Sequence, residues 1–172
     1  MVVVAPPAWE EPAILLAEEV GASKVAACVT GADTRAGSVR AGLAEVPDDA
    51  AVVLVHDAAR PVLPADVVER VVQALGEGFD GAVPALPVVD TVKRVQADVV
   101  AETLARESLV AVQTPQGFVA SVLRAALASG EDGSDCASLV ERHGGRVRVV
   151  RGDERLLKVT TRADLELVAA WL

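Results

Sequence analysis

The sequence predicts an α/β fold: an open, mostly parallel sheet with helices on both faces and a projecting β-arm. Short apolar segments alternate along the chain with segments whose apolar residues follow a helical period, which is typical of such sheets. The apolar run at Ala51–Val55 is continuous, which indicates a strand buried on both faces. The 172 residues suffice for one domain and not for two ordinary ones, so residues 1–172 are expected to form a single domain.

The first half of the chain predicts strands and helices in strict alternation. Val2–Ala5 is a short apolar run that stops at two prolines and indicates a strand. In the helix expected at Trp9–Glu19, the acids Glu10 and Glu11 lie in the first turn, where they suit the positive end of the helix. The next expected elements are strands at Lys24–Val29 and Ala51–Val55 and helices at Thr34–Leu43 and from Pro64 to Gly76.

The second half continues the alternation after one long interruption. Thr161 with Asp164 three residues later has the pattern of a capping box at the start of the last helix. The expected strands are Gly81–Leu86, Arg146–Val150 and Leu157–Val159, and the expected helices are Val119–Ala128, Ala137–His143 and Thr161–Leu172.

The interruption, residues 87–113, has no helical period and is far longer than the usual connection of about 4–6 residues. It nevertheless carries valines and leucines throughout. Because an isolated two-stranded ribbon is marginal in water, these side chains need a partner surface. We therefore expect a projecting arm that builds a two-fold homodimer; an ordinary internal hairpin is the alternative.

The composition excludes several classes of partner. Sixteen Lys and Arg residues against 25 Asp and Glu residues give a formal net charge of −9, which argues against binding to nucleic acid or an anionic membrane. The chain has no Tyr, two Trp and two Phe, so a base-stacking platform for single-stranded nucleic acid is not expected. No apolar run approaches the roughly 20 residues that span a bilayer, and Met1–Pro7 lacks the features of a signal peptide.

Two cysteines, Cys28 and Cys136, are too few for a metal cluster of their own, and we predict no metal-ligating set of residues. A disulfide between them stays possible, with a reducing compartment as the default. The protein is therefore expected to be cytoplasmic.

The first candidate site is the segment directly after Ala51–Val55. Open α/β sheets bind ligands beyond the carboxyl ends of their strands. Asp57 and Arg60 lie there three residues apart, and Ala58 between them is small enough to let a ligand approach. An Asp57–Arg60 pair that only stabilises the loop is the alternative, but the position at the strand end favours a function.

Two further segments are candidates. In Gly31–Ser38, glycine allows a tight turn, and the N–H groups that enter the next helix suit an anion or a base edge, although Asp33 and Thr34 are equally good helix caps. Lys158 lies in an apolar segment, where a buried lysine is costly unless it is paired or faces an anion. A ligand contact is therefore favoured over a side chain that snorkels at the strand edge.

One motif is rejected. Gly76–Gly81 spells the dinucleotide pattern Gly-x-Gly-x-x-Gly, but it follows a helix, precedes a strand and carries two acids that would repel a pyrophosphate.

Several segments together resemble the 2-C-methyl-D-erythritol 4-phosphate cytidylyltransferases of the non-mevalonate isoprenoid pathway. Their order and spacing cover nearly the whole chain, and His-Asp-Ala-Ala-Arg at 56–60 with Thr-Pro-Gln at 114–116 is a specific combination. The resemblance implies a Rossmann-like nucleotidyltransferase that joins CTP to a sugar-alcohol phosphate and releases pyrophosphate, with Mg²⁺ held mainly by the nucleotide phosphates. The other matching residues are Gly31–Arg35, Ser38, Ala41–Leu43, Asp90–Lys93, Arg106, Ser134, Asp135, Ala137, Ser138 and Lys158–Thr160.

The resemblance also implies roles for individual residues. In that family the counterparts of Asp33 and Ser38 lie against the cytidine. Those of Asp57 and Arg60 line the junction between nucleotide and substrate, and Lys158 would sit by the reacting phosphates.

The acceptor site is implied to draw on two subunits. Thr91 and Arg106 would come from the arm of the other subunit and grip the substrate phosphate, and Ser134 stands where a threonine is usual. The expected catalytic residues are thus Lys158, Arg60 and Asp57; the nucleotide site takes Gly31, Ala32, Asp33, Ser38 and Ala58; and the substrate site takes Thr91, Arg106 and Ser134 with Asp57 and Arg60.

The chain departs from the family pattern at its start. Family members open with a strand and an Ala-Ala-Gly-x-Gly-x-Arg loop followed by a lysine, whereas this sequence begins at what resembles the next strand. Ala32 also replaces a usual glycine, and Cys136 a usual acid. We therefore expect an N-terminally incomplete domain with weak CTP binding and little or no turnover.

Two other functions stay open. A ribitol 5-phosphate cytidylyltransferase would keep the scaffold and change the acceptor, and residues of the arm would decide between the two acceptors. A non-catalytic dimerisation or regulatory module would keep the fold without the triphosphate site.

Overall fold

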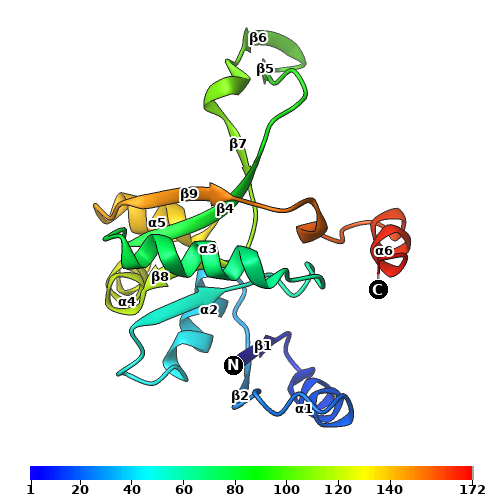
Figure 1. Cartoon of the computed structure of the whole chain (residues 1–172), viewed down its shortest axis with the longest axis vertical. Coiled ribbons are helices and arrows are strands. Elements are labelled where there is room, and N and C mark those ends of the chain that lie inside the picture. The colour runs from blue at the N-terminus through cyan, green and yellow to red at the C-terminus, as the bar shows by residue number, and fades with distance from the viewer. Residues whose placement is uncertain (172) are drawn as a thin grey trace.

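The computed structural model describes residues 1–171, and its largest sheet has five strands (Figure 1). β3 (Val52–Val55), β8 (Gln116–Val119), β4 (Gly81–Pro87) and β7 (Val110–Val112) follow in that order, and β9 (Val147–Arg151) pairs with β4. The β4–β9 pair is parallel, whereas β8 pairs antiparallel with both β3 and β4, and β7 antiparallel with β4. The α/β fold is confirmed, and this sheet is mixed rather than mostly parallel because β7 and β8 run against β4.

A second, two-stranded sheet lies at the amino-terminal end of the chain. β1 (Val2–Ala5) pairs in parallel with β2 (Ala27–Thr30), α1 (Glu10–Glu19) connects them, and α2 (Arg35–Ala44) packs on both strands. The strand expected at Lys24–Val29 begins only at Ala27, because the chain first forms a turn in which the Val25 N–H donates to the Ala22 carbonyl.

Helices cover both faces of the large sheet. α3 (Ala65–Gly76) packs on one face, and α4 (Ala120–Ala128) and α5 (Cys136–Arg142) pack on the other (Figure 1). Neighbouring residues of β4 show this division, because successive side chains of a strand point to opposite faces. Ala82 belongs to the α3 cluster, whereas Val83 belongs to the cluster of α4 and α5.

β3 is less buried than its apolar sequence predicts. Val53 and Val55 pack against the core, but Val52 and Leu54 are 38% and 39% exposed. The expectation of a strand buried on both faces is therefore wrong for β3, because its core contacts lie on one face.

The carboxyl-terminal part contains one correction and one confirmation. Leu157–Val159 is not a strand; it follows a 3₁₀ turn, η2 (Glu154–Leu156), and the Val159 N–H donates to the Ala59 carbonyl instead of joining a ladder. α6 (Arg162–Ala169) opens with the expected capping box of Thr161 and Asp164. Its expected last residue, Leu172, lies outside the described residues.

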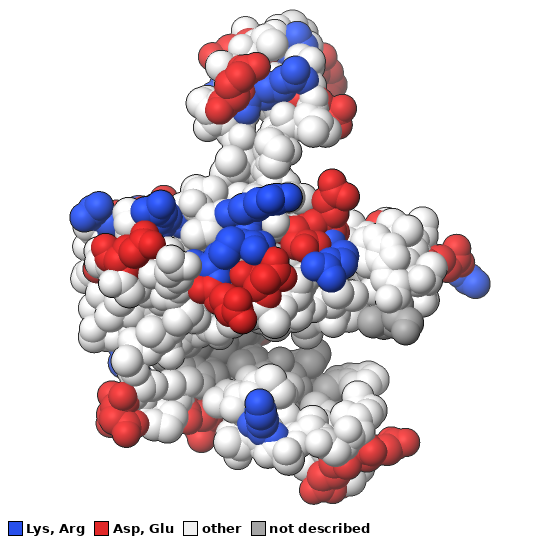
Figure 2. All heavy atoms as spheres, viewed as in Figure 1, with Lys and Arg blue, Asp and Glu red and all other residues white. Residues whose placement is uncertain are grey.

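The arm projects from the body as expected, with β4 and β7 as its stem and a ribbon of β5 (Lys93–Gln96) and β6 (Val99–Thr103) at its tip (Figure 1). Between ribbon and stem lies a second 3₁₀ turn, η1 (Arg106–Ser108). Val89, Val95 and Val99 are 75%, 63% and 68% exposed. Figure 2 shows charged side chains at the tip and an uncharged neck below it. The projection is confirmed, and the homodimer stays a prediction.

Within residues 1–171, no helix combines the length and the apolar character that crossing a membrane requires.

Candidate active site

Three cationic side chains surround Asp57, directly after β3. Lys158 Nζ lies 3.3 Å from Asp57 Oδ2, and Arg60 Nε lies 3.7 Å from the same oxygen. Arg35 Nη2 lies 3.7 Å from Asp57 Oδ1. The cluster therefore carries an excess of positive charge in a chain whose net charge is −9. The structure brings together the three residues expected to be catalytic, Asp57, Arg60 and Lys158.

The loop that carries Asp57 is held by hydrogen bonds at both ends. The Asp57 N–H donates to Thr114 Oγ1 at 3.0 Å. Thr114 Oγ1 also lies 3.1 Å from His56 Nδ1, and His56 Nε2 lies 2.9 Å from the Arg60 carbonyl oxygen. His56 and Thr114 thus fix the backbone of the site; both stand in the motifs quoted above, but the sequence assigned them no role.

Arg60 is the most deeply placed of the three cations. Its side chain is 12% exposed, and Nη1 donates to the Leu156 carbonyl at 2.5 Å. Burial lowers the pKa of the guanidinium, and the negative charge of Asp57 opposes that effect. Within the described residues, Arg60 Nε is buried and has no hydrogen-bond acceptor. A ligand oxygen that reached it would satisfy this donor.

Lys158 occupies a different environment from the one its sequence predicts. The side chain is 50% exposed and ion-paired with Asp57 rather than buried inside an apolar strand. The turn η2 and the hydrogen bond from Val159 to Ala59 set Lys158 beside the Asp57 loop. Its ammonium group is therefore both partnered and open to solvent.

The segment Gly31–Ser38 forms a closely packed turn at the start of α2. Ser38 Oγ accepts from the Ala32 N–H at 3.0 Å and donates to the Ala32 carbonyl at 3.1 Å, and Thr34 Oγ1 caps the helix by accepting from Gly37 N–H. A Cβ atom at Gly31 would lie 3.0 Å from Ser38 Oγ, so glycine suits this close approach. Ala32, Asp33 and, in the neighbouring loop, Ala58 are exposed.

Arg35 joins this turn to the Asp57 cluster and to the start of α5. Besides facing Asp57, its Nη1 donates to Cys136 Sγ at 3.3 Å. Cys136 is buried, both cysteines are free thiols, and burial raises the pKa of the Cys136 thiol. Sequence reasoning missed the role of Arg35 because nothing in its local sequence shows which carboxylate it meets after folding.

The start of α5 is built around Asp135. Its carboxylate accepts from the Ser138 N–H at 2.9 Å and from Gln116 Nε2 at 2.7 Å, which caps the helix and ties it to β8. Ser134, expected at the substrate site, precedes this cap and is exposed.

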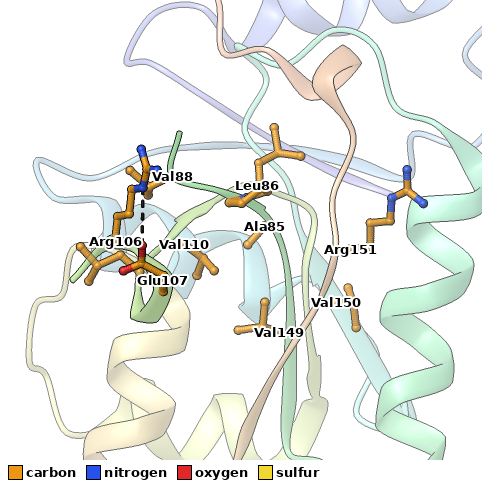
Figure 3. Close-up of a pocket in the computed structure, with 11 residues that line it drawn as sticks. Ala85, Leu86, Val88, Arg106, Glu107, Val110, Val149, Val150 and Arg151 are labelled. Carbon is orange, nitrogen blue, oxygen red and sulfur yellow. Dashed lines mark ion pairs between the residues drawn. The ribbon is translucent and has the colours of Figure 1, made fainter. Parts of the chain in front are cut away.

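Arg106 and Thr91 lie apart from the cluster, on the arm. Arg106 borders a hollow of about 570 Å³ at the base of the arm, with Arg151 on its other side and apolar side chains between them (Figure 3). Its guanidinium donates to the Val89 carbonyl and lies 3.7 Å from Glu107. Thr91 is exposed. Asp57 is not among the residues that line this hollow.

No group of three or more His, Cys, Asp or Glu side chains within residues 1–171 is arranged to hold a metal ion. Asp57 is the carboxylate at the centre of the cluster, so any bound divalent cation would need most of its oxygen ligands from elsewhere.

Comparisons with known proteins agree on one family. The sequence model described as IspD, 2-C-methyl-D-erythritol 4-phosphate cytidylyltransferase, matches residues 1–172. A protein of that name from Nocardia farcinica is 48% identical over 173 residues, which cover 100% of this chain and 74% of the relative. Another from Saccharopolyspora erythraea is 49% identical over 176 residues, which cover 99% and 78%. The crystal structure of the Thermus thermophilus cytidylyltransferase matches with a TM-score of 0.81 at 35% identity, over 99% of this chain and 80% of that chain.

Proposed function

Because the chain belongs to the 2-C-methyl-D-erythritol 4-phosphate cytidylyltransferase family, we propose that it joins CTP to 2-C-methyl-D-erythritol 4-phosphate. The products are the CDP-linked alcohol, a precursor in isoprenoid synthesis, and pyrophosphate. The observation that carries this proposal is the group of Arg35, Arg60 and Lys158 around Asp57 at the carboxyl end of β3. Such a group offers positive charge where two polyanions must meet.

The reaction needs positioning and charge neutralisation more than a strong base. A phosphate oxygen of the acceptor, already an anion, forms a bond to the α-phosphorus of CTP, and the bond from that phosphorus to the departing pyrophosphate oxygen breaks. Holding the two anions in line and stabilising the charge that develops supplies most of the rate enhancement in such transfers. The site therefore requires fixed cations, which is what the cluster offers.

Arg60 and Lys158 divide this work according to their environments. Arg60 is nearly buried, anchored to the Leu156 carbonyl and ion-paired with Asp57, so its guanidinium is a rigid positive charge for the phosphates. Lys158 is half exposed and able to leave Asp57 for a phosphate during the reaction. Asp57 keeps both cations on one side of the loop before the substrates arrive.

The cytidine is assigned to Gly31–Ser38. The hydrogen bonds between Ser38 and Ala32 form this turn before any ligand binds. Asp33 is exposed beside it, and a carboxylate there is suited to accept from the exocyclic amine of cytosine. Arg35 connects the same turn to Asp57. The base would therefore bind at Gly31–Ser38 and the reacting phosphates beside it, at the Asp57 loop.

Magnesium is proposed to enter with the nucleotide. Mg²⁺ in phosphate-transferring sites is commonly held by one or two carboxylates together with substrate phosphates and water. Asp57 would be the single protein ligand, because it is the carboxylate at the centre of the cluster. When bound, the ion would neutralise phosphate charge.

The acceptor phosphate is assigned to Thr91 and Arg106 of a second copy. The exposed valines of the arm support an interface between copies. The arm extends away from the body (Figure 1), as an arm that contacts a second copy must. This assignment explains why Arg106 lies away from the cluster of its own protomer.

A pyrophosphate-release assay with CTP and Mg²⁺ tests the function. Release that requires 2-C-methyl-D-erythritol 4-phosphate supports it. Equal or faster release with ribitol 5-phosphate would assign the alternative acceptor. Titration calorimetry that detects no CTP binding, together with no release, would favour a non-catalytic module.

A further inference from the structure

Arg35 is the one cation of the cluster for which the proposed reaction supplies no direct task. It is the first residue of α2, and its side chain is 32% exposed. One guanidinium nitrogen faces Asp57 Oδ1 at 3.7 Å, and another donates to Cys136 Sγ at 3.3 Å. Arg35 therefore connects the cytidine turn, the Asp57 loop and the first turn of α5.

The two oxygens of Asp57 face different partners. Oδ2 meets Lys158 at 3.3 Å and Arg60 at 3.7 Å, whereas Oδ1 meets Arg35. The backbone of Asp57 is fixed through its N–H bond to Thr114. The terminal torsion of an aspartate is broad and roughly two-fold, however. The orientation of the carboxylate therefore depends on the cations around it.

Cys136 allows Arg35 to direct its charge at Asp57. The thiol is buried, and its raised pKa keeps it protonated at neutral pH. A neutral sulfur accepts a weak hydrogen bond and does not compete as an anion for the guanidinium. The hydrogen bond to Cys136 thus fixes the position of the Arg35 guanidinium, and Asp57 remains the charged partner of Arg35.

We propose that Arg35 is a positioning residue for cytidylyl transfer, which holds Oδ1 of Asp57 so that only Oδ2 contacts Lys158 and Arg60. This inference rests on the proposed function. Without Arg35, both carboxylate oxygens would turn toward Lys158 and Arg60 and neutralise the charge that the phosphates need. Arg35 acts through Asp57 and does not itself touch the reacting atoms.

A double-mutant cycle tests the link. We expect Arg35→Gln to lower kcat by about tenfold or more with a smaller change in the KM for CTP, because orientation rather than binding is lost. In an Asp57→Asn background the same change should have less than about a twofold effect, because coupled residues are not additive. Equal effects of Arg35→Gln in the two backgrounds would overturn the proposal.

Two further variants separate positioning from folding. Arg40→Gln removes another arginine of α2, which donates to the Leu127 carbonyl and not to Asp57, and it should leave kcat within about twofold. Arg35→Lys keeps the charge but not the guanidinium fork, so it should recover part of the lost rate. No recovery with Lys from a folded variant would contradict the proposal.

Crystal structures of the wild-type protein and of Arg35→Gln, or of Arg35→Lys if the Gln variant does not fold, give a readout that does not depend on turnover. We expect the Asp57 carboxylate to rotate in the variant, with both oxygens facing Lys158 and Arg60. An unmoved carboxylate would reject the role of Arg35. A wild-type chain that neither binds CTP nor releases pyrophosphate would instead reject the proposed function, whatever these structures show.

Discussion

The cationic side chains around Asp57 come from three separate segments of the chain. Arg35 comes from the start of α2, Arg60 from the same loop as Asp57, and Lys158 from the segment after η2. Asp57 and Arg60 were detectable in the sequence because they follow the apolar run Ala51–Val55, and Lys158 was detectable because it lies within an apolar segment. The contact between Arg35 and Asp57 was not detectable, because the two residues come together only when the chain folds. A chain of net charge −9 must create its anion site locally in this way.

Arg60→Lys should destabilise the fold as well as the site. The shorter ammonium group cannot keep both the Leu156 carbonyl bond and the position beside Asp57, and an unsatisfied buried acceptor costs about 2 kcal/mol. Urea unfolding measures this loss. As a control, Arg162→Lys changes an arginine whose side chain is 91% exposed, so it should alter the free energy of unfolding by less than about 0.5 kcal/mol. Equal stability of the two variants would contradict the buried role of Arg60.

The elements differ in how far local sequence determines them. α6 begins where Thr161 and Asp164 predict it, because a capping box is made of bonds between neighbours. Leu157–Val159 has an apolar sequence typical of a strand but does not form one. β3 does form, but it packs against the core on one face only. Strand pairing and burial depend on distant segments, so an apolar run alone does not determine either.

The capping box of α6 should make stability depend on pH. Hydrogen bonds from the Thr160 N–H, and then from Thr161, lower the pKa of Asp164 from 3.8 to about 2. Because the folded pKa lies below the unfolded value, this contribution is complete above about pH 4 and is lost as the pH falls toward 2. Asp164→Asn should therefore lower the melting temperature at pH 6 and match the wild type near pH 2.

A parallel series with Asp48→Asn is the control for that titration, because the Asp48 side chain is fully exposed and its nearest cation, on Arg124, is 3.9 Å away. Its melting temperature should follow the wild type at every pH. If Asp164→Asn lost the same stability at pH 2 as at pH 6, the carboxylate would not be the source of the effect.

At the scale of the whole molecule, the arm is the feature that one protomer does not explain. Its existence was predictable from residues 87–113, which are too long and too apolar for a loop. The direction of the arm was not predictable, because the sequence does not show where the ribbon leaves the sheet. In the structure the ribbon of β5 and β6 is exposed along its whole length, and Arg106 borders a hollow that Asp57 does not line.

Val99→Glu should convert a homodimer into monomers. Val99 is 68% exposed on the ribbon, and a carboxylate there would be buried without a partner in an arm-mediated interface. Size-exclusion chromatography with light scattering measures the mass. Val72→Glu changes a valine of α3 that is 42% exposed and lies off the arm, and it should leave the mass unchanged. A wild-type protein that runs as a monomer would remove the basis for the shared site.

Mixing two inactive variants is the most direct check on a site assembled from two copies. Lys158→Met disables the cluster and Arg106→Met disables the arm, so a mixed pair retains one complete pocket. Subunit exchange at equal concentrations should restore about a quarter of the wild-type rate of pyrophosphate release, the share of intact pockets in a randomly paired two-fold assembly. Mixtures that stay as inactive as their components, although exchange is shown to occur, would contradict the account.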